Sequence, residues 1–309
     1  MHILLSFIGI LPEYILFCLY QIRIYNKKIP IYLIYNDYNS KFINRIKTFD
    51  VKLINYEDVN KNITILNNLK EKFIVVNRLK DRKELFFRSF ERLYLLRNLM
   101  ELLKLEDALF LEIDNLIYDD PIKWFNLFKK ENINIAFMID NLNRASIGIS
   151  YFKDLKSVKK ITDHYDNFYL KYTNLERRKK LNNKILNEMT AIYDFYIKNK
   201  KDCFILPTSH IHHNKVPELN SNFSIFNFLF DSASYGIYLL GYDTYHTNGK
   251  IVLHQQSQWS RIKPSNNIFW TEDNGLKKPY LLADDKKIFI KNLHVHSKDL
   301  KSGLSKKFV

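Results

Sequence analysis

A chain of 309 residues is long enough to bury a full hydrophobic core, either as one large domain or as two merged ones. Its content of 46% hydrophobic and 15% aromatic residues excludes a disordered chain, and no segment approaches the roughly 20 uninterrupted apolar residues of a membrane-spanning helix. The net charge of +15 would attract anionic partners. The lysines are scattered, however, which is typical of solvated surfaces encoded by an AT-rich genome, so charge alone selects no partner.

The first 20 residues are apolar but are interrupted by Pro12 and Glu13, and they carry neither a basic n-region nor a small-residue cleavage site. We therefore expect a strand, a turn and a helix here rather than a signal peptide. The two cysteines, Cys18 and Cys203, are far apart in sequence and predict neither a disulfide framework nor a metal site. This cysteine usage favours a reducing compartment and hence a cytoplasmic protein.

The first 140 residues alternate short apolar runs with helical patterns. Strands are predicted at 3–8, 31–35 and 51–54, and helices at 14–23 and 42–49. A strongly amphipathic helix follows at 85–105, because its apolar residues recur at alternating three- and four-residue steps. Buried strands are then predicted up to residue 113 and at 133–139. Strands that alternate with helices of this length predict an α/β fold with a mainly parallel sheet.

After residue 140 the pattern changes. A strand is predicted at 146–152 and helices at 155–172 and 184–198, followed by shorter strands and loops. No Ser/Gly linker, low-complexity block or internal repeat separates the two halves. We therefore predict a single domain over residues 1–309, in which residues 1–140 and 141–309 are merged halves.

An apolar run ends in two carboxylates, Glu112 and Asp114, with one residue between them. Side chains alternate along a strand, so both carboxylates are expected to point the same way. Two adjacent carboxylates repel each other unless a cation lies beside them. Oxygen ligands of this kind suit Mg²⁺ or Mn²⁺, which keep water and substrate phosphates as further ligands. The pair therefore predicts a nucleotide-diphosphate site, and the alternative is a strand that merely ends at the surface.

Three segments carry a family resemblance. Residues 110–115 (FLEIDN), preceded by the strands at 3–8 and 31–35 and by a helix bearing Arg88 and Arg92, resemble the nucleotide-binding half of the GT-A glycosyltransferases. Residues 293–298 (LHVHSK) resemble the closing metal and phosphate segment of such enzymes. Residues 230–241 (FDSASYGIYLLG) are similar to a segment of glycosyltransferases from large DNA viruses and bacterial polysaccharide clusters.

The resemblance implies a GT-A-like fold, in which a mainly parallel sheet is flanked by helices. Residues 1–140 would form a Rossmann-like half that binds the nucleotide sugar. Residues 141–309 would form the acceptor half and carry the metal and phosphate segment. If the protein is viral, its expected location is the host cytoplasm.

The resemblance also implies a divalent metal, Mn²⁺ or Mg²⁺. Asp114 is the expected carboxylate ligand, because the last acid of the family's Asp-x-Asp motif usually contacts the metal. Glu112 replaces the first aspartate and is expected to meet the ribose or a metal-bound water. Imidazole is an acceptable further ligand for Mn²⁺, so His294 and His296 are both candidates. The two would share one face if a strand predicted at 287–295 continues past them. Lys298 is expected to meet the diphosphate as a point charge.

The nucleotide itself is expected at the carboxyl edge of the sheet, where open α/β folds bind their ligands. Gly9, Asn36 and Asp37 follow two of the predicted strands and would line this pocket. Arg92 would face the nucleotide or its phosphates, although a solvated helix position is an equally good interpretation of this arginine.

Inversion at an anomeric carbon needs a base for the acceptor hydroxyl. Asp231 is the preferred candidate, because the matching family segment surrounds it, and its alternative role is a helix N-cap. Glu188 is the second candidate, because its helical spacing places a carboxylate on or beside a buried face.

The predicted function is a metal-dependent glycosyltransferase. It would move a sugar from a nucleoside diphosphate-sugar, expected to be a UDP-sugar, to a hydroxyl of a glycan or protein acceptor, with no nucleic-acid partner. A nucleotidyltransferase stays open, since paired carboxylates also serve there, although no Gly-rich phosphate loop is present. A basic nucleic-acid-binding protein is the third possibility, supported by charge and by 20 Tyr and 23 Phe. The sugar, base, acceptor, stereochemical course and oligomeric state are not determined.

Overall fold

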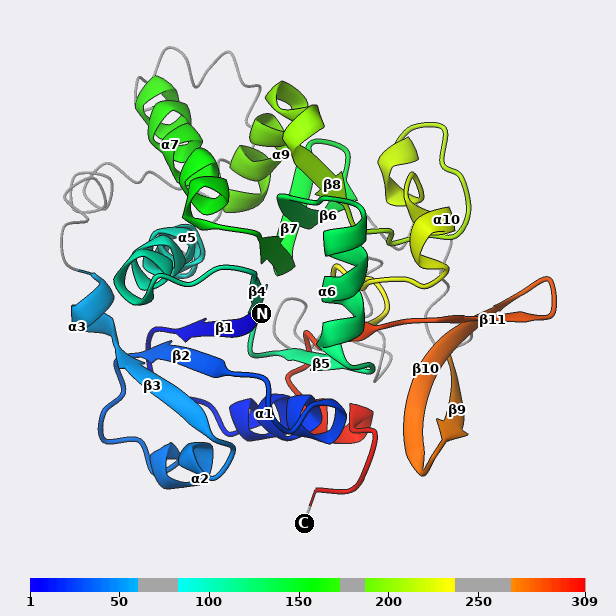
Figure 1. Cartoon of the computed structure of the whole chain (residues 1–309), viewed down its shortest axis with the longest axis horizontal. Coiled ribbons are helices and arrows are strands. Elements are labelled where there is room, and N and C mark those ends of the chain that lie inside the picture. The colour runs from blue at the N-terminus through cyan, green and yellow to red at the C-terminus, as the bar shows by residue number, and fades with distance from the viewer. Residues whose placement is uncertain (61–82, 173–186, 237–267, 309) are drawn as a thin grey trace.

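The computed structural model describes residues 1–60, 83–172, 187–236 and 268–308 (Figure 1). Its centre is a seven-stranded sheet with the order β3-β2-β1-β4-β7-β6-β8. In that order the strands are β3 (Val51–Asn55), β2 (Ile31–Tyr35), β1 (His2–Phe7), β4 (Ala108–Leu111), β7 (Arg144–Phe152), β6 (Ile135–Asn141) and β8 (Cys203–Ile205).

Most strands of this sheet are parallel. β1 pairs in parallel with β2 and β4, β2 with β3, and β6 with β8, whereas β7 runs antiparallel between β4 and β6. The predicted α/β fold with a mainly parallel sheet is thus confirmed. Strands from both predicted halves of the chain contribute to the same sheet.

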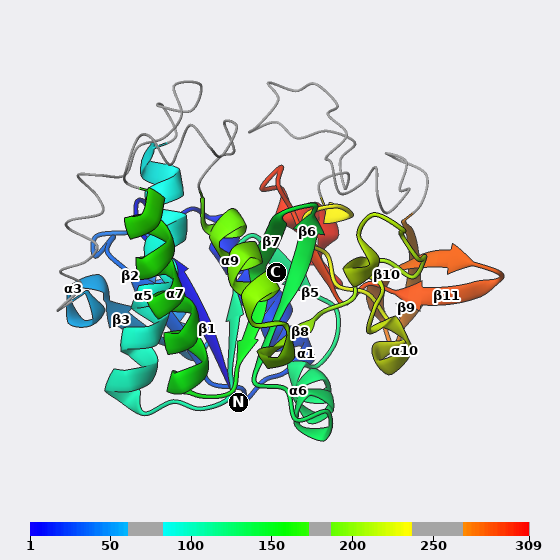
Figure 2. The ribbon, with the colours of Figure 1, turned by 90° about the horizontal axis from the view of Figure 1, so that it is seen from above.

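Helices cover both faces of the sheet (Figures 1 and 2), because its central strands are apolar on both sides. All five residues of β2 are buried, for example. One core lies against α1 (Tyr14–Tyr25) and α6 (Pro121–Lys130). The other lies against α5 (Lys83–Leu103), α7 (Leu155–Tyr172) and α9 (Glu188–Lys198). The short helices are α2 (Ile43–Lys47), α3 (Tyr56–Val59) and α10 (Phe223–Phe226).

The main elements form where the apolar patterns place them, and α7 has the predicted bounds. α9 begins at Glu188, where Asn187 and Thr190 form a reciprocal capping box. The first residues of the helix predicted at 184–198 lie outside the described residues, as does most of the lysine- and asparagine-rich stretch that precedes α5. No helix within the described ranges is both long and apolar enough to cross a membrane.

The C-terminal part of the chain differs from the prediction. The strand expected to continue from residue 287 to 295 is divided into β11 (Lys286–Phe289) and β12 (Asn292–His294). β11 belongs to a separate antiparallel sheet with β9 (Phe269–Asp273) and β10 (Leu276–Ala283), which projects to one side in Figure 1. β12 instead pairs antiparallel with β5 (Asn115–Ile117), directly after the carboxylate pair. This pairing places His294, near the C-terminus, beside the turn that carries Glu112 and Asp114.

A buried amide fastens the C-terminal segment to the first helix. Gln21 of α1 donates from Nε2 to the carbonyl of Ile117, at 2.7 Å, and to the hydroxyl of Ser305, also at 2.7 Å. Its Oε1 accepts from the backbone N–H of Ser305 at 3.1 Å. Gln21 and Ser305 are both buried, so water cannot replace these hydrogen bonds.

Replacing Gln21 with leucine should therefore lower the free energy of unfolding by about 1–3 kcal/mol, the typical cost of leaving buried polar groups unpaired. Chemical denaturation should show a lower midpoint with an unchanged slope. Tyr20→Phe, at the position before Gln21, is a matched control. It removes only one exposed hydrogen bond, which the Tyr20 hydroxyl donates to the carbonyl of Lys307. Equal midpoints for the two variants would contradict the structural role of Gln21.

Candidate active site

The two carboxylates are brought together by a turn rather than by strand alternation. β4 ends at Leu111, and the backbone N–H of Asn115 donates to the carbonyl of Glu112 at 3.0 Å. The tight turn holds Glu112 and Asp114 at the carboxyl end of β4, while Ile113 is buried in the core. Strand alternation, the reason for which both acids were expected to point the same way, therefore does not apply, because the strand ends before Glu112.

The C-terminal strand adds an imidazole to the pair. Because β12 places His294 opposite Asn115, Nε2 of His294 lies 3.2 Å from Oδ2 of Asp114 and 3.2 Å from Oε2 of Glu112. One potential ligand atom from each of the three side chains lies within 4.8 Å of the other two. The structure thus brings together residues that are about 180 positions apart in sequence.

Asp114 lies between His294 and Lys298. Its side chain is largely buried, and Lys298 forms an ion pair with the same carboxylate. Burial alone would raise the pKa of the Asp114 carboxyl, but the charges and hydrogen bonds of His294 and Lys298 hold it well below its usual range. Lys298 has a φ of 63°, which is uncommon for lysine. Asp114 is therefore an ionised carboxylate at neutral pH.

Glu112 has a cationic partner of its own. Arg92 of α5 forms an ion pair with it, and the guanidinium lies 5.7 Å from the centre of the Phe110 ring. Both side chains are largely shielded from solvent. Arg92 thus contacts a carboxylate of the candidate site, and its expected contact with the nucleotide or its phosphates stays a prediction.

His296 occupies a different position from His294. β12 ends at His294, so the two histidines do not continue along one strand face as predicted. Their rings instead meet edge to face, with centroids 4.8 Å apart. The group of potential metal ligands within the described residues contains His294 and not His296. Of the two candidates, the geometry favours His294.

The three side chains fit a divalent cation. Two carboxylates and one imidazole form an acceptable donor set for Mn²⁺. Gly148 of β7 lies directly against this group, since a Cβ atom there would lie 3.0 Å from Oε2 of Glu112 and 3.2 Å from Nδ1 of His294. Glu112 therefore lies in a position to bind metal directly, rather than only a ribose or a metal-bound water.

Asp231 has an environment unlike that of a base. It is 0% exposed, and its two carboxylate oxygens accept four backbone hydrogen bonds, from Ser234, Tyr235, Gly236 and His294. A general base needs a carboxylate oxygen that is not already engaged in hydrogen bonds. This arrangement argues against the predicted catalytic role. The carboxylate instead closes a local turn, because three of the donors lie three to five residues ahead. The helix that Asp231 was expected to cap lies outside the described residues.

Glu188 is the other predicted base. It is the first residue of α9, and its Oε2 is buried without a hydrogen-bond partner among the described residues. Burial raises the pKa of the Glu188 carboxyl, and the nearby charges of Arg92 and Arg144 oppose this shift only in part. Arg92 thus pairs with Glu112 of the candidate site, and its charge is also felt by Glu188 at the start of α9.

The predicted nucleotide-binding residues meet at the carboxyl ends of β1 and β2. The backbone N–H of Gly9 donates to Oδ1 of Asn36 at 2.8 Å, and that of Leu11 donates to Oδ2 of Asp37 at 2.9 Å. Gly9 has a φ of 128°, which favours glycine. These contacts shape the loop after β1 and leave its Ile10 side chain 87% exposed.

Three residues that contact the site, Gly148, Asn115 and Asn292, were not among the predicted site residues. Gly148 carries one sequence signal, because a glycine inside an apolar strand marks a close approach by other groups. Asn292 is buried and donates from Nδ2 to Oδ1 of Asn115 at 2.8 Å. Neither asparagine carries a pattern that could have revealed this contact. It depends on the pairing of β5 with β12.

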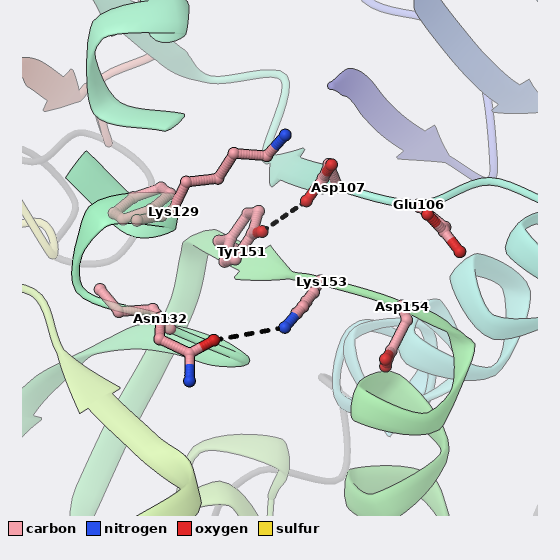
Figure 3. Close-up of a pocket in the computed structure, with 9 residues that line it drawn as sticks. Glu106, Asp107, Lys129, Asn132, Tyr151, Lys153 and Asp154 are labelled. Carbon is pink, nitrogen blue, oxygen red and sulfur yellow. Dashed lines mark hydrogen bonds between the residues drawn. The ribbon is translucent and has the colours of Figure 1, made fainter. Parts of the chain in front are cut away.

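A separate cavity of about 400 Å³ lies near the opposite edge of the sheet, where β4 begins and β7 ends (Figure 3). Tyr151 in its wall donates a hydrogen bond to Asp107 at 2.6 Å. None of the predicted site residues lines this cavity. The cavity therefore does not belong to the carboxylate site.

No family model and no curated protein sequence matches the chain. Among solved structures, the chain is similar to the apo form of mouse xyloside xylosyltransferase 1, with 9% identity and a TM-score of 0.44 over 67% of this chain and 84% of that chain. It is also similar to the glycosyltransferase GlyE of Streptococcus pneumoniae TIGR4, with 12% identity and a TM-score of 0.40 over 66% of this chain and 45% of that chain.

A cytidylyltransferase from Leptospira borgpetersenii is similar too, with 10% identity and a TM-score of 0.38 over 67% of this chain and 75% of that chain. The first two of these proteins are glycosyltransferases, the family that the sequence motifs resemble. At these identities and TM-scores the likeness carries no argument about function. The function is therefore argued from the chemistry of the site.

The geometry predicts different results for the two histidines. His294→Ala should weaken Mn²⁺ binding by about 10- to 100-fold or more, by analogy with the cost of disturbing a metal's surroundings, because Nε2 of His294 faces both carboxylates. His296→Ala should leave the affinity within a factor of about three. Calorimetric titration of each folded variant with Mn²⁺ measures both effects. A loss of binding in His296→Ala alone would show that the ligand is misassigned.

Proposed function

We propose that the protein is a metal-dependent glycosyltransferase that moves a sugar from a nucleoside diphosphate-sugar to a hydroxyl acceptor. The observation that carries the proposal is the group of Glu112, Asp114 and His294 at the carboxyl end of β4, with Lys298 in contact with it. This edge of an open α/β sheet is the usual place for a nucleotide. The same group would serve a donor whose diphosphate must be neutralised as it departs.

The cation and the basic side chains have complementary roles in this proposal. A divalent cation held by the three ligands would neutralise negative charge on the diphosphate leaving group. The Lys298 ammonium can turn from Asp114 toward a phosphate oxygen, because its flexible stem carries a point charge. Arg92 stays paired with Glu112 and orients that carboxylate. The chain's own residues thus bind and orient the donor.

The loop after β1 would form the wall of the nucleotide pocket. Asn36 and Asp37 hold the backbone of this loop, as their contacts with Gly9 and Leu11 indicate. The exposed Ile10 side chain would then offer an apolar surface to the base. A UDP-sugar is the proposed donor, on the resemblance of the motifs to GT-A enzymes. A glycan or protein hydroxyl is the proposed acceptor.

Replacing Asp114 with alanine should abolish Mn²⁺-dependent binding of a nucleoside diphosphate. The residue lies in a turn outside the apolar core, so the fold should persist. Calorimetric titration with UDP, GDP and CDP, each with and without Mn²⁺, tests this and also identifies the base. Glu101→Ala on the exposed surface of α5 is the control, and it should bind as the unchanged protein does.

Unchanged Mn²⁺-dependent affinity in folded Asp114→Ala would remove the central claim. The nucleotidyltransferase alternative is separated by its products. A glycosyltransferase releases a nucleoside diphosphate from the donor, whereas a nucleotidyltransferase joins a nucleoside triphosphate to a sugar phosphate and releases pyrophosphate. Assay of the two released products with the same enzyme preparation therefore discriminates between the functions.

Glu188 is the proposed base if the reaction inverts the anomeric configuration. Its carboxylate would accept the acceptor's hydroxyl proton as the new glycosidic bond forms and the bond from the anomeric carbon to the diphosphate breaks. Three observations support this role. The carboxyl has a raised pKa, its Oε2 has no hydrogen-bond partner among the described residues, and it interacts electrostatically with Arg92, the ion-pair partner of Glu112.

Glu188→Gln should lower turnover by about 10²- to 10⁴-fold, the usual contribution of a general base, while donor binding stays within a few-fold. The amide preserves the size of the side chain, so the thermal midpoint should change little. Turnover, donor affinity and product stereochemistry by NMR are the measurements, with Glu101→Gln as control. A product that retains the anomeric configuration would exclude the base role, and so would a fully active Glu188→Gln enzyme.

A further inference from the structure

The Asp231 carboxylate lies at the centre of a buried hydrogen-bond network. Oδ1 accepts from the backbone N–H groups of Ser234 at 2.6 Å and Tyr235 at 2.8 Å. Oδ2 accepts from those of Gly236 at 2.7 Å and His294 at 2.8 Å. Three of the donors belong to the local turn, but the fourth belongs to a metal-ligand candidate 63 residues away.

Asn292 connects the same two segments a second time. The backbone N–H of Asp231 donates to Oδ1 of Asn292 at 2.8 Å, and Nδ2 of Asn292 donates back to the carbonyl of Asp231 at 2.9 Å. Nδ2 also donates to Oδ1 of Asn115, which follows Asp114 directly. The turn that carries Asp114, the strand that carries His294 and the segment after Asp231 are therefore held together by buried hydrogen bonds.

The packing at Gly236 is equally close. A Cβ atom on this residue would lie 2.6 Å from the carbonyl carbon of His294 and 2.7 Å from its backbone nitrogen, and it would overlap the carbonyl oxygen. No side chain larger than hydrogen fits without moving the His294 backbone. The segment from Asp231 to Gly236 thus lies directly against the backbone of the proposed ligand.

We infer that Asp231 is a positioning residue for His294, which it holds in place for a divalent cation without contacting the cation itself. The inference rests on the proposed metal site. With the backbone N–H of His294 fixed by Oδ2 of Asp231, its ring projects to within 3.2 Å of both Glu112 and Asp114. The imidazole is therefore in position before a cation arrives, so ordering this ligand adds little to the cost of binding.

A carboxylate suits this position better than an amide. Four N–H donors converge on two oxygens, and both oxygens of an ionised carboxylate accept. Asparagine offers one accepting oxygen, and its NH₂ group would face two of the N–H donors. Asp231→Asn should therefore lose either the Ser234 and Tyr235 pair or the Gly236 and His294 pair.

The first test is Mn²⁺ titration of the full chain, without nucleotide, by calorimetry. Asp231→Asn and Gly236→Ala should each weaken Mn²⁺ binding by about tenfold or more, as changes in the groups that orient a metal ligand usually do. Asp154→Asn is the matched control, because its Oδ1 accepts from the backbone N–H of Ser157 at 2.8 Å at the start of α7. This control should bind Mn²⁺ as the unchanged protein does.

A double-mutant cycle separates positioning from a general loss of stability. In a His294→Ala background, Asp231→Asn should weaken the residual Mn²⁺ affinity by less than about twofold, because the ligand it orients is already gone. An equal weakening in both backgrounds would overturn the inference. So would a folded Asp231→Asn protein with unchanged Mn²⁺ affinity.

A measurement on the unchanged protein remains decisive if the variants do not fold. Amide hydrogen exchange of the metal-free chain should show the His294 N–H protected, because Asp231 accepts its hydrogen bond without any cation. Exchange at the rate of an unstructured peptide would overturn the inference. If the unchanged protein binds no Mn²⁺ although its His294 N–H is protected, the proposed function fails while the network itself stands.

Discussion

The repulsion between two carboxylates held in one turn is the constraint on which the rest of the site depends. Glu112 and Asp114 cannot separate, because the turn is closed by a backbone hydrogen bond and Ile113 is buried beneath it. Their negative charge is balanced by side chains from distant parts of the chain. Arg92 pairs with Glu112, and Lys298 pairs with Asp114. A cation bound by Glu112, Asp114 and His294 would add to this balance by neutralising the same two carboxylates.

The position of β12 is set by its pairing with β5, the strand that follows the carboxylate turn. β5 emerges directly from the carboxylate turn and would present unpaired backbone groups without a neighbour. β12 pairs with it and carries His294 to the turn, while Gln21 and Ser305 join the following segment to α1. The strand pairing that satisfies the backbone is therefore also the pairing that completes the ligand group. The contacts that stabilise this part of the fold are thus also those that form the proposed site.

Two glycines show how little space this arrangement leaves. Gly148 faces the ligand side chains, and Gly236 lies against the backbone of His294. A larger residue at the first position would crowd the space in which a cation is proposed to bind, and one at the second would displace the ligand that binds it. The buried carboxylate of Asp231 acts on the same strand by hydrogen bonding. The site is thus shaped as much by backbone packing as by its charged groups.

Local patterns in the sequence were enough to predict the α/β class and most helices and strands, and to single out Glu112 and Asp114 as candidates. Hydrophobic periodicity reports which face of a segment is buried, and a carboxylate pair after an apolar run is visible without a structure. Only the tertiary structure showed which histidine lies beside the two carboxylates, which residue pairs with Lys298 and that Asp231 is buried. These features depend on pairings between residues far apart in the chain, such as β5 with β12. Local periodicity carries no record of which distant segments meet.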